Sequence, residues 1–267
     1  MDYTTRYGLE YDPFLKNAKD NIIESGDYRE ACARLSYLQN IKGFGVITGN
    51  PGTGKTTAVR KWASGLNPSL YKVIYTSMSS LSDNEFYSNL VSKMAMEPHF
   101  RKSVNIRMIK TEIERIYSEN RKTPVFIFDE AAQIRSSIIE DLKMLFNFEM
   151  DSKDKAAVVL VGLPKLNAVL NLGAHEAIKQ RIVMNYNLEG LSKAESKEYV
   201  ESKLKRAGCT REVFEPAALE AVVNAGNGTP RVINRLCAAC LHIGNLREAP
   251  SITAEIVMMA SEDIMLA

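Results

Sequence analysis

The stretch GFGVITGNPGTGKTTAVRKW, residues 43–62, decides the fold. An apolar run, residues 44–49, enters a glycine-rich turn that leads into a basic, helix-forming segment. Residues 49–56 match the pattern G-x-x-x-x-G-K-[ST] in full, and they stand where that pattern requires, between a strand and a helix. Glycines let the backbone curl so that successive N–H groups face a phosphate, and the start of the helix adds partial positive charge. The stretch therefore predicts a phosphate-binding loop, in preference to a glycine turn without a ligand.

Each part of this loop has an expected role in holding a nucleoside triphosphate and its Mg²⁺. Lys55 is expected to reach the β- and γ-phosphates, and Thr56 offers a hydroxyl to Mg²⁺. The residues expected to bind the nucleotide are Gly49, Asn50, Pro51, Gly52, Thr53, Gly54, Lys55, Thr56 and Thr57.

An acidic pair ends a second apolar strand, VFIFDE at residues 125–130. Carboxylates at the end of a buried strand are costly unless a cation lies near them. Asp129 is therefore expected to hold Mg²⁺, and Glu130 to orient and deprotonate the attacking water. The pair favours hydrolysis over phosphoryl transfer to a bound acceptor. The alternative is an acidic cap on the strand.

The middle of the chain alternates short apolar runs with helical patterns. The runs are nearly continuous in apolar character, as in strands buried on both faces of a parallel sheet. They lie at residues 44–49, 72–77, 125–130 and 157–162, and a further strand around residues 181–188 is expected to join the sheet. The helical stretches between them are TTAVRKWASGL, DNEFYSNLVSKMAM, IRMIKTEIERIYSEN and SSIIEDLKMLFNFEM. This alternation predicts an α/β sandwich with a parallel sheet and right-handed crossovers.

Towards the carboxyl end of the chain the strand patterns stop and helix signals take over. Ser192 stands three residues before Glu195, which is a capping box, and Pro216 occupies a first helical position. Two more helices are expected near residues 230–243 and 253–264. These signals predict a small all-helical domain after the α/β core.

Two arginines stand where a triphosphate could be sensed. Arg231, in GNGTPRVINRL, follows a glycine-rich turn at the start of a predicted helix, and it could fold back onto the γ-phosphate. Arg181, in IKQRIV, precedes the last strand of the core and could reach a neighbouring subunit's nucleotide as an arginine finger does. The alternative for each is a surface salt bridge.

Composition excludes several classes of protein. With 267 residues, 45% apolar and 25% charged, the chain is typical of globular proteins. Lys+Arg 34 against Asp+Glu 32 gives a net charge of +2, so any basic surface must be local. The amino terminus lacks an apolar signal sequence, and no run of about 18 apolar residues occurs. We therefore expect a cytoplasmic protein without a membrane partner.

The four cysteines are expected to be reduced. Cys237 and Cys240 form a C-x-x-C inside a predicted helix, but no second pair of ligands follows. Two small residues on a buried helix face are a better interpretation than a metal site.

Residues 99–122 form a locally basic segment with seven Lys or Arg against three Glu. Such clusters contact DNA phosphates without a side-chain code. The candidate DNA contacts are Arg101, Lys102, Arg107 and Lys110. Since aromatic residues do not alternate with the basic ones as a single-strand stacking platform requires, duplex DNA without sequence specificity is favoured. The alternative is a solvated helix with i,i+4 pairs such as Lys110 with Glu114.

Taken together, these motifs resemble an AAA+ ATPase, and their order resembles that of the ExeA/TniB group. The likeness covers about residues 7–243. It is carried by YGLEYDPF, EACARLSYLQNIKGFGVITGNPGTGKTT, FIFDEAAQI, LVGLPKL, KQRIVMNYNLEGLS and NGTPRVINRLC. The group includes ATPases of general secretion and ATP-dependent regulators of transposition, of the TnsC and MuB type.

The resemblance implies a P-loop AAA+ sandwich at residues 45–189 and a helical lid at residues 190–267, with ATP and Mg²⁺ as cofactors. It implies that the N-terminal segment and first helix, residues 1–44, close over the adenine. Arg231 would be the second sensor and Arg181 the finger.

There is one departure from the pattern of the group. Leu163 follows Gly162, where a polar first sensor is common, so we expect a slow, switch-like ATPase.

The resemblance also implies a function. A core and a lid with nothing appended is typical of the transposition regulators, which form rings or helical filaments on duplex DNA and hand the target to a transposase. We therefore expect a homo-oligomer with duplex DNA and a transposase as partners. Two alternatives stay open: a secretion or envelope-assembly ATPase acting on protein partners, and a nucleotide-dependent scaffold with negligible turnover.

Overall fold

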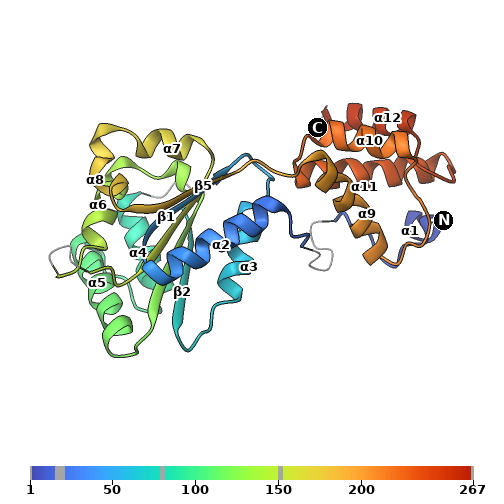
Figure 1. Cartoon of the computed structure of the whole chain (residues 1–267). Helices are drawn as coiled ribbons and strands as arrows, with labels where there is room; N and C mark the ends of the chain where they lie inside the picture. Colours follow the sequence, from blue (N-terminus) through green and yellow to red (C-terminus); the bar gives the residue numbers. More distant parts are fainter. Residues whose placement is uncertain (1, 16–21, 79–81, 150–152, 266–267) are drawn as a thin grey trace. The chain divides into compact units, whose positions relative to one another are not determined.

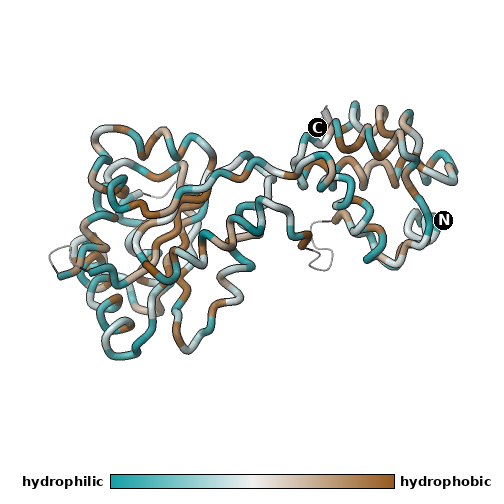
Figure 2. Tube along the Cα trace, in the orientation of Figure 1, coloured by the Kyte–Doolittle hydropathy of each residue, from teal (hydrophilic) through white to brown (hydrophobic). Residues whose placement is uncertain are grey.

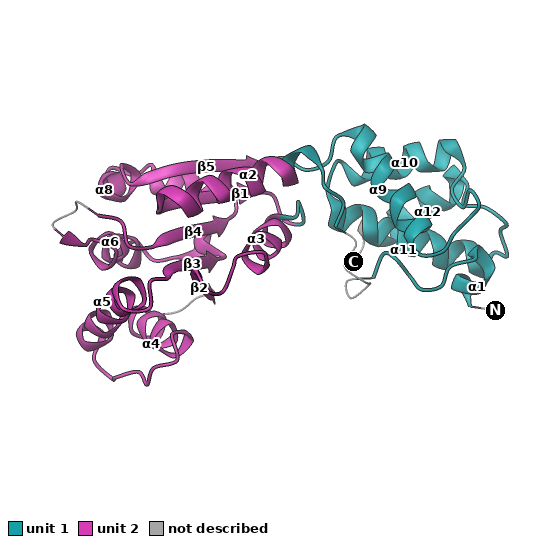
Figure 3. Cartoon of the chain, turned by 60° about the horizontal axis from the view of Figure 1, so that its bottom comes forward, with its two compact units in different colours: residues 1–27, 52–54, 189–267 teal, residues 28–51, 55–188 magenta. Residues whose placement is uncertain are grey.

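The chain forms two compact units in the computed structural model, which describes residues 2–15, 22–78, 82–149 and 153–265 (Figure 1). The helical unit consists of residues 1–27, 52–54 and 189–267 (Figure 3). The core unit consists of residues 28–51 and 55–188.

The core unit is built on a parallel sheet with the strand order β2-β3-β4-β1-β5. The strands are β1 (Gly43–Gly49), β2 (Tyr71–Ser77), β3 (Thr123–Asp129), β4 (Ala157–Gly162) and β5 (Ile182–Leu188). All five lie where the sequence predicts strands. The predicted fold class, an α/β sandwich with a parallel sheet, is confirmed.

Helices cover both faces of this sheet. The α-helices are α2 (Gly26–Ile41), α3 (Lys55–Ser64), α4 (Asp83–Lys93), α5 (Lys102–Ser118), α6 (Ser136–Leu145), α7 (Lys165–Leu170) and α8 (Glu176–Lys179). The described residues also form the short 3₁₀ turns η1 (Ala131–Gln133) and η3 (Gly173–His175). Buried side chains of α2 and α3 pack on one face, and those of α4 to α8 pack on the other, so the unit has three layers.

Burial along each strand follows its place in the sheet. Every residue of β1 is buried, because β4 and β5 flank it and helices cover both of its faces. The edge strand β2 instead alternates, with Val73 and Tyr75 exposed and Ile74 buried. The hydrophobic strands are visible as brown segments inside the core unit (Figure 2).

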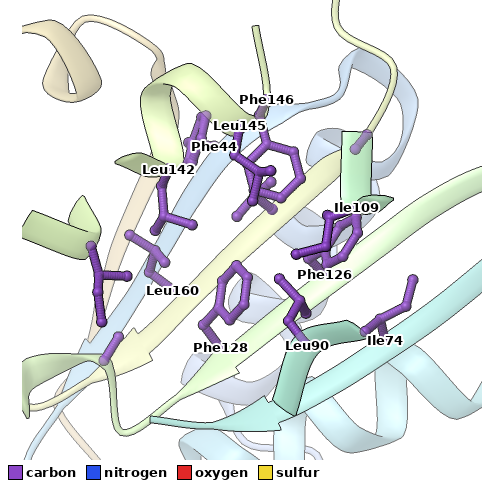
Figure 4. Packing of buried hydrophobic residues seen from close by; sticks show 14 of the residues in the cluster. Phe44, Ile74, Leu90, Ile109, Phe126, Phe128, Leu142, Leu145, Phe146 and Leu160 are labelled. Atoms are coloured by element: carbon purple, nitrogen blue, oxygen red, sulfur yellow. The ribbon is translucent and has the colours of Figure 1, made fainter. Parts of the chain in front are cut away.

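Aromatic side chains fill the layer between the sheet and α6 (Figure 4). Phe146 meets Phe44 of β1 edge to face with ring centroids 5.7 Å apart, and Phe126 of β3 with centroids 4.9 Å apart. Edge-to-face pairs contribute about 0.5–1.5 kcal/mol each beyond the area they bury. This layer fixes the end of α6 against the middle of the sheet.

The helical unit has its own hydrophobic core. Its helices are α1 (Tyr3–Tyr7), α9 (Lys193–Arg206), α10 (Pro216–Gly226), α11 (Pro230–Leu246) and α12 (Ala254–Met265). The predicted capping box of α9 is confirmed, since Ser192 and Glu195 bond reciprocally, and Pro216 opens α10 as predicted. The four helices expected in this domain are all present.

The N-terminal segment belongs to the helical unit. Tyr7, Leu9 and Phe14 are buried in the same hydrophobic core as α9 to α12. Lys203 of α9 donates a buried hydrogen bond of 2.7 Å to the carbonyl oxygen of Pro13. Apolar burial and this bond together tie the segment to the helices.

The expected N-terminal element, residues 1–44, therefore divides. Residues 1–27 join the helical unit, and residues 28–41 of α2 pack on the core unit through Ala31, Leu35 and Leu38. The division arises because the apolar residues of the two parts match different hydrophobic cores. Closure of the segment over an adenine stays a prediction.

Cys237 and Cys240 lie in the hydrophobic core of the helical unit. Burial raises the pKa of the Cys240 thiol to about 12. The described residues contain no cluster of His, Cys, Asp and Glu that could hold a metal ion. Within the part of the chain that is described, no helix is long and apolar enough to cross a membrane.

Candidate active site

The phosphate loop connects β1 to α3, as the sequence predicts. Gly52 and Gly54 have positive φ angles of 86° and 102°, a region that L side chains rarely adopt. A Cβ added to Gly54 would meet nothing within 4 Å, so open space lies beside the backbone at this point. A glycine-rich turn with positive φ angles, placed between a strand and a helix, fits a phosphate-binding loop.

Lys55 stands at the first position of α3 and turns back towards the loop. Its Nζ donates to the carbonyl oxygens of Gly49 and Asn50, at 2.8 and 2.7 Å. The ammonium is thereby held at the loop. A phosphate oxygen is a stronger acceptor for it than a peptide carbonyl, because the bond is then charge-assisted on both sides. The arrangement fits the predicted contact with the β- and γ-phosphates.

Asp129 ends β3 and is 8% exposed. Its Oδ2 accepts from the hydroxyl of Thr56 at 3.0 Å and from that of Tyr75 at 3.1 Å. Its Oδ1 accepts from the backbone N–H of Glu130 at 2.8 Å. Three donors from three elements therefore fix the rotation of this carboxylate.

The structure thus brings together the two predicted metal ligands, Thr56 and Asp129. A hydroxyl oxygen and a carboxylate oxygen 3.0 Å apart are hard ligands of the kind that Mg²⁺ prefers. The donor set fits the ion. Bound there, Mg²⁺ would neutralise charge that develops on the triphosphate.

Glu130 is exposed and has a left-handed backbone, with φ 59°. Its carboxylate oxygen Oε2 accepts a hydrogen bond of 3.1 Å from the hydroxyl of Ser77. A non-glycine residue in this conformation costs about 1–2 kcal/mol, and such strain concentrates at functional sites. The exposed carboxylate beside Asp129 fits the predicted role of orienting and deprotonating water, which stays a prediction.

Tyr75 and Ser77 are site residues that the sequence analysis missed. They lie two positions apart on β2, so both face the same side of the edge strand, and each donates to one residue of the acidic pair. The pKa of Tyr75 is raised to about 12, mainly by burial and further by the charge and hydrogen bond of Asp129. The phenol therefore stays a hydrogen-bond donor at neutral pH. The available signal was the run of three hydroxyl side chains, Tyr75, Thr76 and Ser77, that ends the stretch KVIYTS.

A polar network surrounds Thr48, the residue before the last one of β1. Asn167 of α7 donates to the buried hydroxyl of Thr48 at 3.2 Å, and Thr48 donates to Asn187 of β5 at 3.0 Å. A Cβ on Gly162 would lie 3.0 Å from the backbone N of Ala132, so the end of β4 packs tightly on η1. The polar group that bonds Thr48 therefore comes from α7, because the residue that follows β4 is the apolar Leu163.

Arg181, the candidate arginine finger, is held against the end of α6 in this structure. Its guanidinium donates to the carbonyl oxygens of Lys143 and Phe146 at 3.1 and 3.2 Å, and pairs with Asp154 at 3.1 Å. Its side chain is 12% exposed. The physical reason is that the end of α6 leaves carbonyls without helical partners, and a cation there also interacts favourably with the helix dipole. An arginine-finger role stays a prediction, and it requires the guanidinium to leave these acceptors.

Arg231 is the second residue of α11, in the helical unit. Within that unit its backbone N–H donates to the carbonyl oxygen of Gly52 at 3.4 Å. The sensing role predicted for its guanidinium stays a prediction.

The four candidate DNA contacts divide into two kinds. Lys102 pairs with Asp141 at 2.5 Å and with Asp83 at 3.4 Å, and the hydrogen bond to Asp141 raises the pKa of its ammonium. Its charge is therefore neutralised within the core unit. Arg101 and Arg107 are exposed, and the guanidinium of Arg101 lies 5.2 Å from the ring of Phe100.

Lys110 is half-buried, and its ammonium lies 5.9 Å from the ring centroid of Phe148. The pair Lys110–Glu114 considered from the sequence is not what the structure shows, because Glu114 pairs with Lys155 at 3.5 Å. Arg101 and Arg107 are thus the better candidates for phosphate contacts.

Comparison with known proteins agrees with this fold. Residues 39–170 match the family model described as an AAA domain. The chain is 29% identical over 267 residues to general secretion pathway protein A of Aeromonas hydrophila, and the match covers 98% of this chain and 48% of that protein. The chain therefore spans about half the length of this curated relative.

Two solved structures from Aeropyrum pernix are similar to the chain. The ORC2 protein with ADPNP and ADP has a TM-score of 0.68 and 17% identity, over 94% of this chain and 71% of that chain. The ORC1 protein in complex with DNA has a TM-score of 0.68 and 14% identity, over 94% and 68%. At these identities the likeness shows the fold alone.

The variant Lys55→Ala removes the ammonium that the loop holds. We expect its affinity for a fluorescent ATP analogue to fall by about 100-fold or more, because charge-assisted bonds to phosphate are lost. Fluorescence titration measures this. Affinity within about threefold of the wild type, a difference of less than 1 kcal/mol, would refute the phosphate-loop assignment.

The variant Glu130→Gln keeps an acceptor for Ser77 but removes the base. We expect ATP affinity to be retained and single-turnover hydrolysis to slow by about 10²–10⁴-fold, the range that general bases contribute. Phosphate release in a rapid-mixing experiment checks it. A wild-type rate would show that Glu130 does not activate water, and would favour the scaffold interpretation.

The variant Arg181→Ala separates the two roles of that residue. Because the guanidinium bonds two helix-end carbonyls and one carboxylate, we expect a loss of about 2 kcal/mol in the free energy of unfolding of the core unit. Urea denaturation followed by the fluorescence of Trp62, the chain's one tryptophan and part of α3, measures it. Lys179→Ala, an exposed neighbour, is the control. Unchanged stability with lost hydrolysis would instead support the finger.

Proposed function

The chain carries an AAA domain, an ATPase module that uses ATP with Mg²⁺, and we propose that ATP binding assembles it on duplex DNA to regulate transposition. In this proposal the ATP state forms a ring or helical filament that selects a target and recruits a transposase. Hydrolysis dissolves the assembly. Nucleotide can control such an assembly only if the ATP state binds DNA or neighbouring subunits more tightly than the ADP state.

The observation that carries the DNA part of the proposal is the exposure of Arg101, which caps the start of α5, and of Arg107 in its second turn. Exposed guanidinium groups contact phosphates without reading sequence, as a protein that accepts many targets requires. The same fold occurs in the ORC1 protein whose structure contains DNA. The transposition part rests on the likeness of the motif order to the transposition regulators.

A second candidate is an ATPase that acts on protein partners. The 29% identity to general secretion pathway protein A favours it. The two functions differ in what binds the ATP state, so a DNA-binding measurement separates them.

We expect cooperative binding to a labelled random-sequence duplex only with ATP or a non-hydrolysable analogue, and not with ADP. Fluorescence anisotropy at about 0.1 M salt, where electrostatic contacts are only partly screened, measures it. Absence of binding in every nucleotide state, with ATP affinity intact, would contradict the DNA part and favour protein partners.

A pair of variants on α5 tests the surface in the same assay. Arg107→Gln should weaken binding and lower the slope of log K against log salt by about one, because one phosphate contact is lost. Arg115→Gln removes the same charge from the same helix, but Arg115 already pairs with Glu112 at 2.7 Å, so the slope should stay unchanged. Equal changes in the salt slope for both variants would show that Arg107 does not contact DNA phosphates through this surface.

The transposition part has its own readout. The proposal predicts a transposase gene beside the gene for this chain. With that transposase supplied, insertions into a marked plasmid should depend on the wild-type chain and be lost with Lys55→Ala. Neighbouring secretion genes, or insertion that is independent of the chain, would contradict it.

A further inference from the structure

The edge strand β2 presents two hydroxyl side chains to the acidic pair. Successive strand residues face opposite sides, so Tyr75 and Ser77 share one face while Thr76 faces the other and bonds Asn89 at 2.7 Å. In the register with β3, Ser77 lies opposite Asp129. Tyr75 pairs two positions earlier, and its long side chain reaches diagonally to the carboxylate of Asp129.

The contact of Tyr75 is not imposed by core packing. Tyr75 is 46% exposed, on an edge strand where a polar or apolar side chain would be equally acceptable. Its hydroxyl nevertheless lies 3.1 Å from Oδ2 of Asp129, the same oxygen that accepts from Thr56. A surface phenol directed at a carboxylate that is 8% exposed is a specific arrangement.

The three groups that donate hydrogen bonds to Asp129 belong to different parts of the fold. Thr56 belongs to the first turn of α3, which follows the phosphate loop, and the N–H of Glu130 belongs to a left-handed turn. Tyr75 belongs to the sheet, and its strand pairs with β3 along seven residue pairs. Tyr75 therefore fixes the carboxylate independently of any movement in the loop.

We propose that Tyr75 is a positioning residue that orients Asp129 for a divalent cation. A carboxylate that ligates a metal depends on the groups that hold it, and their loss typically lowers metal affinity by about 10–100-fold. The role rests on the assignment of Thr56 and Asp129 as the Mg²⁺ ligands. The role of Tyr75 does not depend on whether the chain binds DNA, recruits a transposase or forms an oligomer.

The test is the variant Tyr75→Phe, which keeps the ring and removes the hydroxyl. Affinity for a fluorescent ATP analogue is titrated in excess EDTA and then at increasing Mg²⁺. In EDTA the variant should bind as the wild type does. The Mg²⁺ concentration that gives half of the gain in affinity should rise by about tenfold.

Tyr71→Phe is the matched control, because Tyr71 lies four residues earlier on the same face of β2 and packs against the apolar layer of α2 and α3. It should leave both titrations unchanged. Denaturation followed by Trp62 fluorescence confirms that the variants fold.

Two outcomes would overturn the proposal. One is a Mg²⁺ titration of Tyr75→Phe that matches that of the wild type. The other is an equal loss of affinity for the ATP analogue in EDTA and in Mg²⁺, which would mean that the phenol supports the loop or the fold. Asp129→Asn, run in parallel, shows where a failure lies. If it too leaves the Mg²⁺ dependence unchanged, the metal assignment itself is wrong, whereas an effect of Asp129→Asn alone rejects only the role of Tyr75.

Discussion

The parallel direction of all five strands is the constraint on which the rest of the core unit depends. Parallel strands end at one edge of the sheet, so the loop after β1 and the acidic pair after β3 meet there, although β4 lies between their strands. The first turn of α3 then places Thr56 3.0 Å from Asp129. One reversed strand would put these groups at opposite edges. A nucleotide site in an open α/β sheet follows from this geometry.

The sequence predicts those parts of the site that are contiguous in the chain. The phosphate loop and the acidic pair are each one short motif at the end of an apolar strand, so local pattern was enough to find them and the layers around them. Tyr75 could not be found in this way. Its contact with Asp129 spans 54 positions and depends on the register of β2 against β3, and a tyrosine in an apolar run is ordinary for a strand.

Charge was less predictable than fold, because a charged side chain is defined by partners from other elements. The basic pattern of α5 does not show that Asp83 of α4 and Asp141 of α6 converge on Lys102. Nor does it show that Arg107 stays exposed. Within a locally basic stretch, tertiary contacts therefore decide which cations are left to attract a polyanion, and the count of charges overstates them.

Arg181 illustrates how strand direction limits function. It directly precedes β5, and its carbonyl oxygen accepts from the N–H of Phe44 near the start of β1 at 3.3 Å. The phosphate loop begins at the other end of β1, about 20 Å away for a strand of this length. The guanidinium of Arg181 therefore cannot reach the loop of its own subunit.

If Arg181 acts on a nucleotide, that nucleotide belongs to a neighbouring subunit. Loss of the contacts with α6 then becomes part of the free energy of assembly. An arginine held by the end of α6 in one state and by a neighbour's phosphate in another would link assembly to the bound nucleotide. Phosphate oxygens accept charge-assisted bonds from a guanidinium, so they can replace the two carbonyls and the carboxylate that hold it in this structure.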